Sequence, residues 1–379
     1  MTKKIIAIGS NTSHYVWQAR RNLIKCIQDA GYDVVVLAPR DEYSSRLEGL
    51  GIGHFALPMR MNKNPVSDYL LYRRFVEAFR TIRPHAYLGY TIKPNIYGSM
   101  AAQRLGIPVI NNIAGLGTVF TSDGVVTRIV KRLYRAALKS SALVFFQNPD
   151  DRALFTRRGI VAHDRHDLLP GSGVDLEKFE FRPLSVPSGH DGLRFLLVAR
   201  MLWDKGVGEF VEAARALRMQ HGENIRFCLL GGMDMDNPDA ISQKQMNAWV
   251  DAGHVEYLGY SDDVLGEIEK SDCIVLPSAY PEGTPRTLLE ASAVGRPIIT
   301  TDAPGCRTVV DEGLNGYLCK LRDAEDLSEK IAQIIALSPE KRREMGCAGR
   351  QKIEREFDEA IVIGKYLDAI RALDRSPKR

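Results

Sequence analysis

The stretch from Cys273 to Gly305 reads CIVLPSAYPEGTPRTLLEASAVGRPIITTDAPG and predicts a strand, a helix and a second strand. Its first four residues are apolar on both faces, as in a strand buried within a parallel sheet. Gly283-Thr284-Pro285 is the turn that opens the helix, with Pro285 near the first helical position. Gly295-Arg296-Pro297 then leads into a strand that ends at Thr301. This strand-helix-strand order indicates an α/β fold with a parallel sheet.

The same alternation continues along the chain on both sides of this stretch. The expected strands of the first half are Lys4–Ile8, Asp33–Leu37, Ala86–Gly89, Val109–Ile113 and Leu143–Phe146. Helical patterns between them are Gln18–Ala30, Asp68–Ile82, Asn95–Leu105 and Val125–Leu138. A second set of expected strands is Arg194–Val198, Ile225–Leu230, Val255–Leu258, Cys273–Leu276 and Pro297–Thr301. Buried strands separated by helices are typical of a sheet covered on both faces.

The pattern therefore predicts two doubly wound, Rossmann-like domains that face a cleft. Their expected bounds are residues 1–175 and 176–359, with a Pro- and Ser-bearing linker over 181–192. Residues 360–379 are expected to form a C-terminal helix that crosses back to the first domain. Ligands of open parallel sheets bind outside the carboxyl ends of the strands, so the sites are expected there.

Composition excludes several other classes of protein. The chain has 379 residues, 45% of them hydrophobic and 26% charged, which suits two globular domains rather than a disordered or fibrous chain. No uninterrupted apolar run approaches the roughly 18 residues of a membrane-spanning helix, and the N-terminal apolar run is too short for a signal peptide. The six cysteines are far apart and form no CxxC pair. We interpret them as reduced packing residues of a cytoplasmic protein.

Charge is distributed unevenly between the two halves. Residues 1–175 contain 24 Lys and Arg against 13 Asp and Glu, and the remainder contains 27 against 34, within a total net charge of +4. A basic first half can indicate nucleic acid, but the chain has no zinc finger, RNP aromatic motif or Arg-rich tail. An anionic membrane surface or a phosphorylated substrate is the expected partner instead.

Two acidic and two basic residues of the second half could act on an anionic substrate. Glu282 stands before the predicted helix and Glu290 lies on it, while Arg200 and Lys205 follow the first strand of the domain. Arg provides a planar fork suited to phosphate and Lys a point charge. Backbone N–H groups at a helix start also bind anions such as a diphosphate. Taken alone, Glu282 and Glu290 are also compatible with an ordinary solvated helix.

The order of these elements resembles that of retaining glycosyltransferases of family four, which have the GT-B fold. The resemblance implies that Glu282, Arg200 and Lys205 carry catalysis and that Glu290 binds the ribose. It also implies donor contacts by the first-domain turn, the base segment and the helix start, namely Gly9, Ser10, Leu258, Gly283, Thr284, Pro285, Arg286 and Thr287. Many relatives carry a His after the strand at Val109, but this chain has Asn111-Asn112-Ile113-Ala114-Gly115 there. His14 and His85 are alternatives, although each also suits a packing or surface role.

A narrower resemblance is carried by residues 91–98, 112–117 and 282–286. It is to bacterial enzymes that add N-acetylgalactosamine or a related sugar to an undecaprenyl-diphosphate-linked saccharide in O-antigen, capsule or glycoprotein glycan assembly. The acceptor contacts implied are Lys93, Asn95, Asn112 and Gly115. The resemblance implies a cytoplasmic enzyme associated peripherally with the inner face of the plasma membrane. The helical pattern over 125–139 agrees with a membrane association, because it places a stripe of cations beside an apolar face. That face consists of Val125, Ile129, Leu133 and Ala136. The same pattern also suits a helix that packs on the sheet and exposes its cations to solvent.

No metal or other cofactor is expected. Asp234-Met235-Asp236 is a DxD sequence, but it lies on a Pro-bearing loop, where solvated acids are common. The leading hypothesis is a retaining transferase that uses a UDP-sugar. The alternatives are a soluble acceptor, a UDP-sugar epimerase or hydrolase on the same scaffold, and a nucleotide-sugar-binding module without activity.

Overall fold

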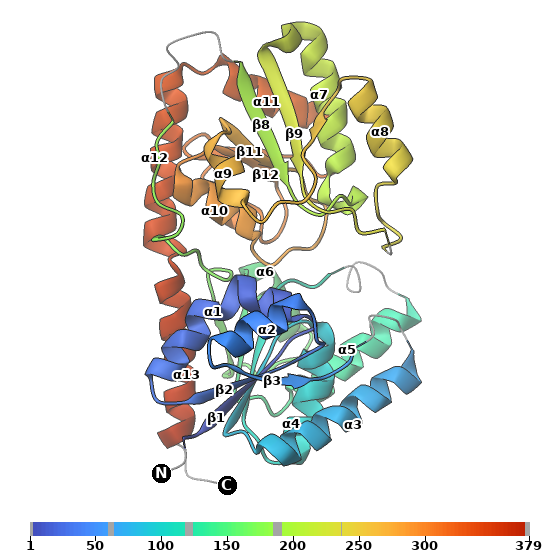
Figure 1. Cartoon of the computed structure of the whole chain (residues 1–379), viewed down its shortest axis with the longest axis vertical. Helices are drawn as coiled ribbons and strands as arrows, with labels where there is room; N and C mark the ends of the chain where they lie inside the picture. The colour runs from blue at the N-terminus through green and yellow to red at the C-terminus, as the bar shows by residue number, and fades with distance from the viewer. Residues whose placement is uncertain (1–2, 60–63, 118–123, 185–191, 236, 376–379) are drawn as a thin grey trace. The chain divides into compact units, whose positions relative to one another are not determined.

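The computed structural model describes residues 3–59, 64–117, 124–184, 192–235 and 237–375, and it divides the chain into two compact units. The first unit comprises Met1–Ser172 together with Ala360–Arg379, and the second comprises Gly173–Glu359. Each unit is an open sheet with helices on both faces (Figure 1). The expected fold of two doubly wound, Rossmann-like domains is confirmed.

The first unit has seven strands in the order β3-β2-β1-β4-β5-β6-β7. Their bounds are β1 Ile5–Gly9, β2 Asp33–Ala38, β3 Gly53–Ala56, β4 Ala86–Gly89, β5 Val109–Ile113, β6 Leu143–Phe146 and β7 His166–Leu168. The helices are α1 Ser13–Asp29, α2 Glu42–Gly49, α3 Pro65–Ile82, α4 Ser99–Arg104, α5 Val125–Leu138, α6 Pro149–Arg157 and α13 Glu359–Arg375, with a π-helical turn η1 at Pro94–Gly98. Every strand pairing in this sheet is parallel.

Side chains alternate between two hydrophobic cores across this sheet. Ile6 and Ile8 of β1 pack with α1 and α13, whereas Ala7 packs with α3 and α4 on the other face. Strand residues are therefore apolar on both faces, which is the pattern that identifies the strands in the sequence.

The C-terminal helix α13 belongs to the first unit. Tyr366 is fully buried in the core between α1 and the sheet, and its hydroxyl accepts a hydrogen bond from Asn112 Nδ2 at 2.8 Å. Asp374, near the helix end, accepts hydrogen bonds from Lys4 Nζ at 2.6 Å and from the Tyr32 hydroxyl at 2.7 Å. These contacts fasten α13 across strands that lie far apart in the sequence.

The second unit has six strands in the order β10-β9-β8-β11-β12-β13, again with parallel pairings throughout. Their bounds are β8 Leu193–Val198, β9 Ile225–Leu230, β10 Glu256–Tyr257, β11 Cys273–Leu276, β12 Ile298–Thr301 and β13 Gly316–Cys319. The α-helices are α7 Val207–His221, α8 Gln243–Asp251, α9 Val264–Glu269, α10 Arg286–Val294, α11 Ala324–Ala336 and α12 Pro339–Glu356. Short 3₁₀ turns are η3 Trp203–Lys205, η4 Gly222–Asn224 and η5 Arg307–Val309.

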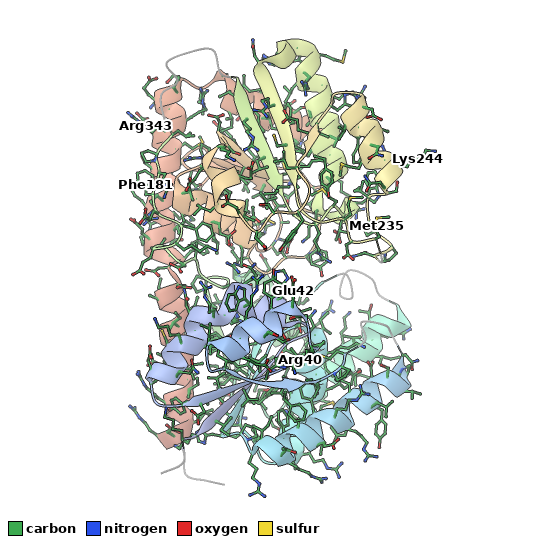
Figure 2. All side chains as sticks on the ribbon, viewed as in Figure 1. Arg40, Glu42, Phe181, Met235, Lys244 and Arg343 are labelled. Carbon is green, nitrogen blue, oxygen red and sulfur yellow. The ribbon has the colours of Figure 1, made fainter. Side chains whose placement is uncertain are left out.

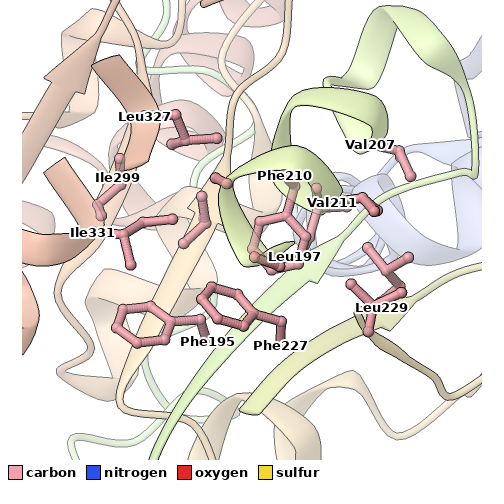
Figure 3. Close-up of a cluster of buried hydrophobic side chains, with 14 of the residues drawn as sticks. Phe195, Leu197, Val207, Phe210, Val211, Phe227, Leu229, Ile299, Leu327 and Ile331 are labelled. Carbon is pink, nitrogen blue, oxygen red and sulfur yellow. The ribbon is translucent and has the colours of Figure 1, made fainter. Parts of the chain in front are cut away.

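The core of the second unit is built on stacked aromatic rings. Phe195 of β8 lies parallel to Phe227 of β9, with ring centroids 5.4 Å apart, and Phe210 of α7 meets Phe227 edge-on at 5.6 Å (Figure 3). Helices α7, α8 and α11 cover this face, while α9 and α10 cover the other. The rigid sheet holds the loops that follow its strands.

Candidate active site

The expected donor-binding residues of the second unit gather where the strand order of its sheet reverses. Strands β8 and β11 are neighbours at this point, with Cys273 paired to Phe195. Arg200 and Lys205 follow β8, and Glu282 follows β11. Such a switch point is the usual ligand position in an open α/β sheet, because the loops after the two central strands diverge there.

Close backbone contacts bring these two loops together. Gly206 has a φ of 76°, and a Cβ atom there would lie 2.1 Å from the Pro277 carbonyl oxygen, so only glycine fits. The N–H groups of Ala279 and Tyr280 donate to the Asp204 carbonyl at 2.9 and 3.0 Å. The turn that carries Lys205 is therefore held against the loop that carries Glu282.

Lys205 forms an ion pair with Glu282 at the centre of this arrangement. The side chains are only 11% and 17% exposed, so water weakens their attraction less than it would at the surface. The Ser278 hydroxyl donates to the same carboxylate oxygen of Glu282 at 3.3 Å, and Lys205 Nζ lies 4.4 Å from the centre of the Tyr280 ring. One cation thus stands between a carboxylate and an aromatic ring.

Arg200 is the more exposed cation of the site. Its guanidinium donates to Asp234 Oδ2 at 2.7 Å, and its side chain is 54% exposed. Asp234 lies on the loop after β9, next to the exposed Met235 that Figure 2 labels. Both cations therefore have a carboxylate partner.

The helix that follows Glu282 begins beside β8. Pro285 is the N-cap residue of α10, and the Thr287 hydroxyl donates to the Val198 carbonyl at 3.3 Å. A Cβ atom at Gly305 would lie 1.6 Å from the Gly283 carbonyl oxygen, so these two loops meet closely. Since the first turn of a helix presents N–H groups to an anion, this end of α10 completes a site for negative charge.

Glu290 lies one helical turn further along α10. Its carboxylate accepts a hydrogen bond from Arg286 at 2.9 Å, and its side chain is 12% exposed. The pair has the spacing at which opposite charges meet on a helix, so Arg286 orients Glu290. Glu290 is thus held by the first residue of the helix, in the middle of α10.

The segment expected to hold the base lies beside the loop after β9. The Gly231 N–H donates to the Gly259 carbonyl at 2.8 Å, and the Tyr257 hydroxyl donates to the Gly231 carbonyl at 2.9 Å. Leu258 is 36% exposed and Tyr260 is 59% exposed. These two side chains are thus presented to solvent next to the loop that carries Asp234.

Burial changes the ionisation of two groups near Lys205. Burial raises the pKa of Asp204 more than any other effect does. Nearby Asp239 raises this pKa further, whereas Lys205 lowers it. Burial also raises the pKa of Tyr280. Tyr280 therefore stays a neutral phenol beside the ammonium group at neutral pH.

A second switch point lies in the first unit, between β1 and β4. A Cβ atom at Gly9 would lie 2.1 Å from the Tyr87 hydroxyl, which donates to the Pro94 carbonyl at 3.0 Å. Ser10 follows Gly9, but its side chain is fully buried and its N–H donates to the Leu37 carbonyl at 3.1 Å. A phosphate contact by Ser10 would require this turn to rearrange.

The four expected acceptor residues occupy different environments. Lys93 follows β4 and donates to Asp68 of α3 at 2.7 Å. Asn95 and Asn112 are each 1% exposed and belong to one hydrogen-bond network, in which Asn95 Nδ2 donates to the Asn112 carbonyl at 2.8 Å. Direct contact with an acceptor would require these amides to leave their present partners. Gly115 is partly exposed with a φ of 98°.

The cationic helix α5 exposes most of its charge. Arg128, Arg132, Arg135 and Lys139 are exposed, and Lys131 is half-buried. Its buried face is formed by Thr127, Tyr134, Ala137 and Leu138. Of the apolar residues expected beside the cations, Ile129 and Ala136 are exposed and Leu133 packs partly on the core, while the side chain of Val125 lies outside the described residues.

Two contacts of the site were not expected from the sequence. Asp234 was considered only as half of a DxD sequence, whose other half, Asp236, lies outside the described residues. Tyr280 stands two residues before Glu282, and an aromatic residue so close to the motif is the signal that could have indicated it. Within the described ranges, no group of three His, Cys, Asp or Glu residues could hold a metal ion.

Comparisons with known proteins identify the class of the two domains. Residues 16–171 match a model described as glycosyl transferase 4-like domain, and residues 183–352 match one described as glycosyl transferases group 1. The chain is a glycosyltransferase of the hexosyltransferase class, built from these two glycosyltransferase domains.

Three individual proteins illustrate the similarity. The chain is 28% identical over 381 residues to the N,N'-diacetylbacillosaminyl-diphospho-undecaprenol alpha-1,3-N-acetylgalactosaminyltransferase of Campylobacter jejuni, covering 96% of this chain and 97% of that protein. It is 24% identical over 283 residues to the UDP-Gal:alpha-D-GlcNAc-diphosphoundecaprenol alpha-1,3-galactosyltransferase of Escherichia coli, covering 72% and 70% of the two proteins. Among solved structures, Anabaena HepE in complex with UDP and glucose aligns with a TM-score of 0.80 at 16% identity, covering 97% of this chain and all of that one. The last of these confirms the fold.

Proposed function

We propose that this glycosyltransferase moves an N-acetylhexosamine, with N-acetylgalactosamine favoured, from a UDP-sugar to an undecaprenyl-diphosphate-linked saccharide with retention of configuration. The observation that carries the proposal is the pairing of Arg200 with Asp234 and of Lys205 with Glu282 in the loops that follow β8, β9 and β11, at the switch point of the second sheet. Both the Campylobacter and the Escherichia relative are named for undecaprenyl-diphosphate-linked acceptors, which supports the acceptor class.

Donor binding is proposed to exchange the ion pairs of the site. The diphosphate takes Arg200 and Lys205 as partners, which releases Asp234 and Glu282. Glu282 then accepts hydrogen bonds from the donor sugar hydroxyls, while Glu290 does so from the ribose. Because a carboxylate is an acceptor with two oxygens, each of these acids can hold a pair of neighbouring hydroxyl groups.

The chemical step follows from this charge arrangement. The bond between the anomeric carbon and the diphosphate oxygen breaks, and the leaving diphosphate gains negative charge that the two cations stabilise. In a front-face reaction the acceptor hydroxyl attacks from the side of the leaving group. Its proton passes to the departing phosphate oxygen, so the protein need not supply a base. We propose that no metal ion is required.

The acceptor lipid places the reaction at the inner face of the plasma membrane. Residues 1–175 hold 24 basic against 13 acidic residues, which suits an anionic lipid surface. The exposed cations of α5 contribute to this attraction. None of the described helices is both long enough and apolar enough to cross a bilayer.

A single assay tests the proposed reaction. The protein is incubated with UDP-N-acetylgalactosamine or UDP-N-acetylglucosamine, with and without a lipid-diphosphate-linked sugar, and UDP and lipid product are measured. UDP release that depends on the acceptor and persists in excess chelator supports the proposal. Epimerised donor, or binding without turnover, would replace it with one of the other functions.

Variants of the site residues distinguish effects on donor binding from effects on turnover. Glu290→Ala is expected to weaken donor binding, whereas Arg200→Ala and Lys205→Ala mainly slow turnover, by up to about 3–4 kcal/mol for one contact to the leaving group. Arg226→Ala is the matched control, because Arg226 is an exposed cation of β9 paired with Glu256 at 2.7 Å. Wild-type turnover in both cation variants would contradict the roles given to Arg200 and Lys205.

A further inference from the structure

Helix α3 exposes an apolar patch on the side away from its sheet. Val66 is 68% exposed, Tyr69 59% and Leu70 48%. Their spacing of three and four residues places them on one face of the first turns. The opposite side of the helix is formed by buried residues such as Leu71 and Phe75. The three exposed residues, here called the α3 patch, therefore take no part in the core.

Exposed cations follow the α3 patch along the helix. Arg73, Arg74 and Arg80 of the same helix are exposed. Helices α3 and α5 both pack on η1 and lie on one face of the first sheet (Figure 1), so the exposed cations of α5 belong to the same side of the unit. Ile129 of α5 adds a further apolar side chain that is 50% exposed. This side of the unit thus combines exposed apolar groups with positive charge.

The core-facing side of α3 contacts the loop that follows β4. Asp68, in the same turn as Val66 and Tyr69, accepts hydrogen bonds from Lys93 Nζ at 2.7 Å and from the Tyr97 hydroxyl at 2.8 Å. Lys93 and Asp68 are only 12% and 19% exposed. This contact holds the first turns of α3, which carry the patch on their outer side, to the loop that carries Lys93, the cation expected to meet the acceptor diphosphate.

We propose that the α3 patch docks on an anionic lipid bilayer, with Tyr69 and Leu70 inserted among the head groups and the exposed cations of α3 and α5 on the lipid phosphates. The positive charge on this side of the unit favours an anionic bilayer over a second copy of the chain as the partner of the α3 patch. Two such faces would bring their cations together, whereas an anionic bilayer attracts them. Apolar side chains flanked by Lys and Arg are the composition of an interfacial helix. The inference rests on the proposed function only in that a lipid-linked acceptor gives the docking its purpose.

Vesicle co-sedimentation of the full chain tests the docking. The double variant Tyr69→Ser/Leu70→Ser is compared with Leu50→Ser, which removes another exposed apolar residue of the same unit, 51% exposed in the wild type. On phosphatidylglycerol-containing vesicles we expect the double variant to lose at least about tenfold in partition coefficient, or about 1.4 kcal/mol, and Leu50→Ser to behave as wild type. Both variants should keep the wild-type melting temperature, since the replaced side chains are exposed.

Several outcomes would overturn the docking. These are unchanged binding of the double variant, equal binding of the wild type to neutral phosphatidylcholine vesicles, and a Tyr69- and Leu70-dependent dimer in solution. The transfer assay separates this inference from the proposed function. If transfer to a lipid acceptor occurs but the double variant binds vesicles as the wild type does, the proposed docking is wrong and the proposed function stands. If the patch binds vesicles but no transfer occurs, the proposed function is wrong and the docking stands.

Discussion

Glu282→Gln is expected to tighten the binding of UDP while slowing sugar transfer. In the free protein Glu282 neutralises Lys205, and both side chains are largely buried. Two unit charges about 4 Å apart attract by about 4 kcal/mol at an effective dielectric constant of about 20. The diphosphate must compete with this attraction for Lys205. Glutamine keeps the shape and a hydrogen-bond acceptor but removes the competing charge.

The gain in UDP affinity is smaller than the full Coulomb energy. Lys205 keeps its contact with the Tyr280 ring, and the Ser278 hydroxyl remains near position 282. We expect about a third of the attraction, about 1.4 kcal/mol, to appear as a roughly tenfold lower Kd for UDP. Turnover should fall, because a neutral amide accepts more weakly from the sugar hydroxyls than a carboxylate does.

Isothermal titration with UDP at low and high salt measures the effect. Glu256→Gln is the matched control, since it removes a carboxylate from the exposed pair with Arg226. Its UDP affinity should equal that of the wild type. A Kd for UDP that is unchanged or higher in Glu282→Gln would refute the exchange of ion pairs, whatever happens to turnover.

Four further predictions concern the two units. Asp68→Asn should lower the KM for the lipid-linked acceptor several-fold, because it removes the negative charge that pairs with Lys93. The KM for the UDP-sugar should not change. Steady-state kinetics in which each substrate is varied in turn would measure both KM values. Tyr366→Phe should lower the free energy of unfolding by about 1–2 kcal/mol in urea titration, because the buried Asn112 amide loses its acceptor. Asp374→Asn should cost about 1 kcal/mol at pH 7, a value reduced for the partial exposure of the group. Burial opposes ionisation of Asp374, but hydrogen bonds from Lys4 and Tyr32 outweigh it and hold its pKa below the usual value. That stability is therefore present above about pH 4 and lost as the pH falls through the lowered pKa, so urea titrations of the variant and the wild type should converge in acid. Gly305→Ala should destabilise the second unit by more than about 3 kcal/mol and abolish UDP binding, since the new methyl group meets the Gly283 carbonyl, and thermal melting with UDP titration checks both effects.

The central strands could be predicted from the sequence because both of their faces are apolar. The predicted bounds of β4, β5, β6, β9 and β11 agree with the structure at both ends. The strands that were not predicted are β3, β7 and β13, the first two with polar residues such as His54 and Asp167. All three lie at sheet edges, where one side of the strand is solvated and the apolar signal is weak.

The candidate site could be predicted only in part. Motif order along the chain indicates that Lys205 and Glu282 approach each other, because they follow neighbouring strands. The pairing of Arg200 with Asp234 depends on the path of a loop, which no periodicity encodes. Asn111 and Asn112 could have been recognised as buried, since β5 offers no solvated face to a polar side chain. Their amides are satisfied inside the unit by Asn95, Ser99 and Gln147.

The return of α13 to the first unit has a consequence for biosynthesis. The core beneath α1 lacks Val362, Tyr366 and Ile370 until these residues have emerged from the ribosome. The second unit lies wholly between Gly173 and Glu359, so it can complete its own core earlier. A nascent chain from which residues 1–359 have emerged, with α13 still inside the ribosome, should therefore present a finished second unit and an open first one, a state in which a chaperone would find exposed apolar surface on the first unit.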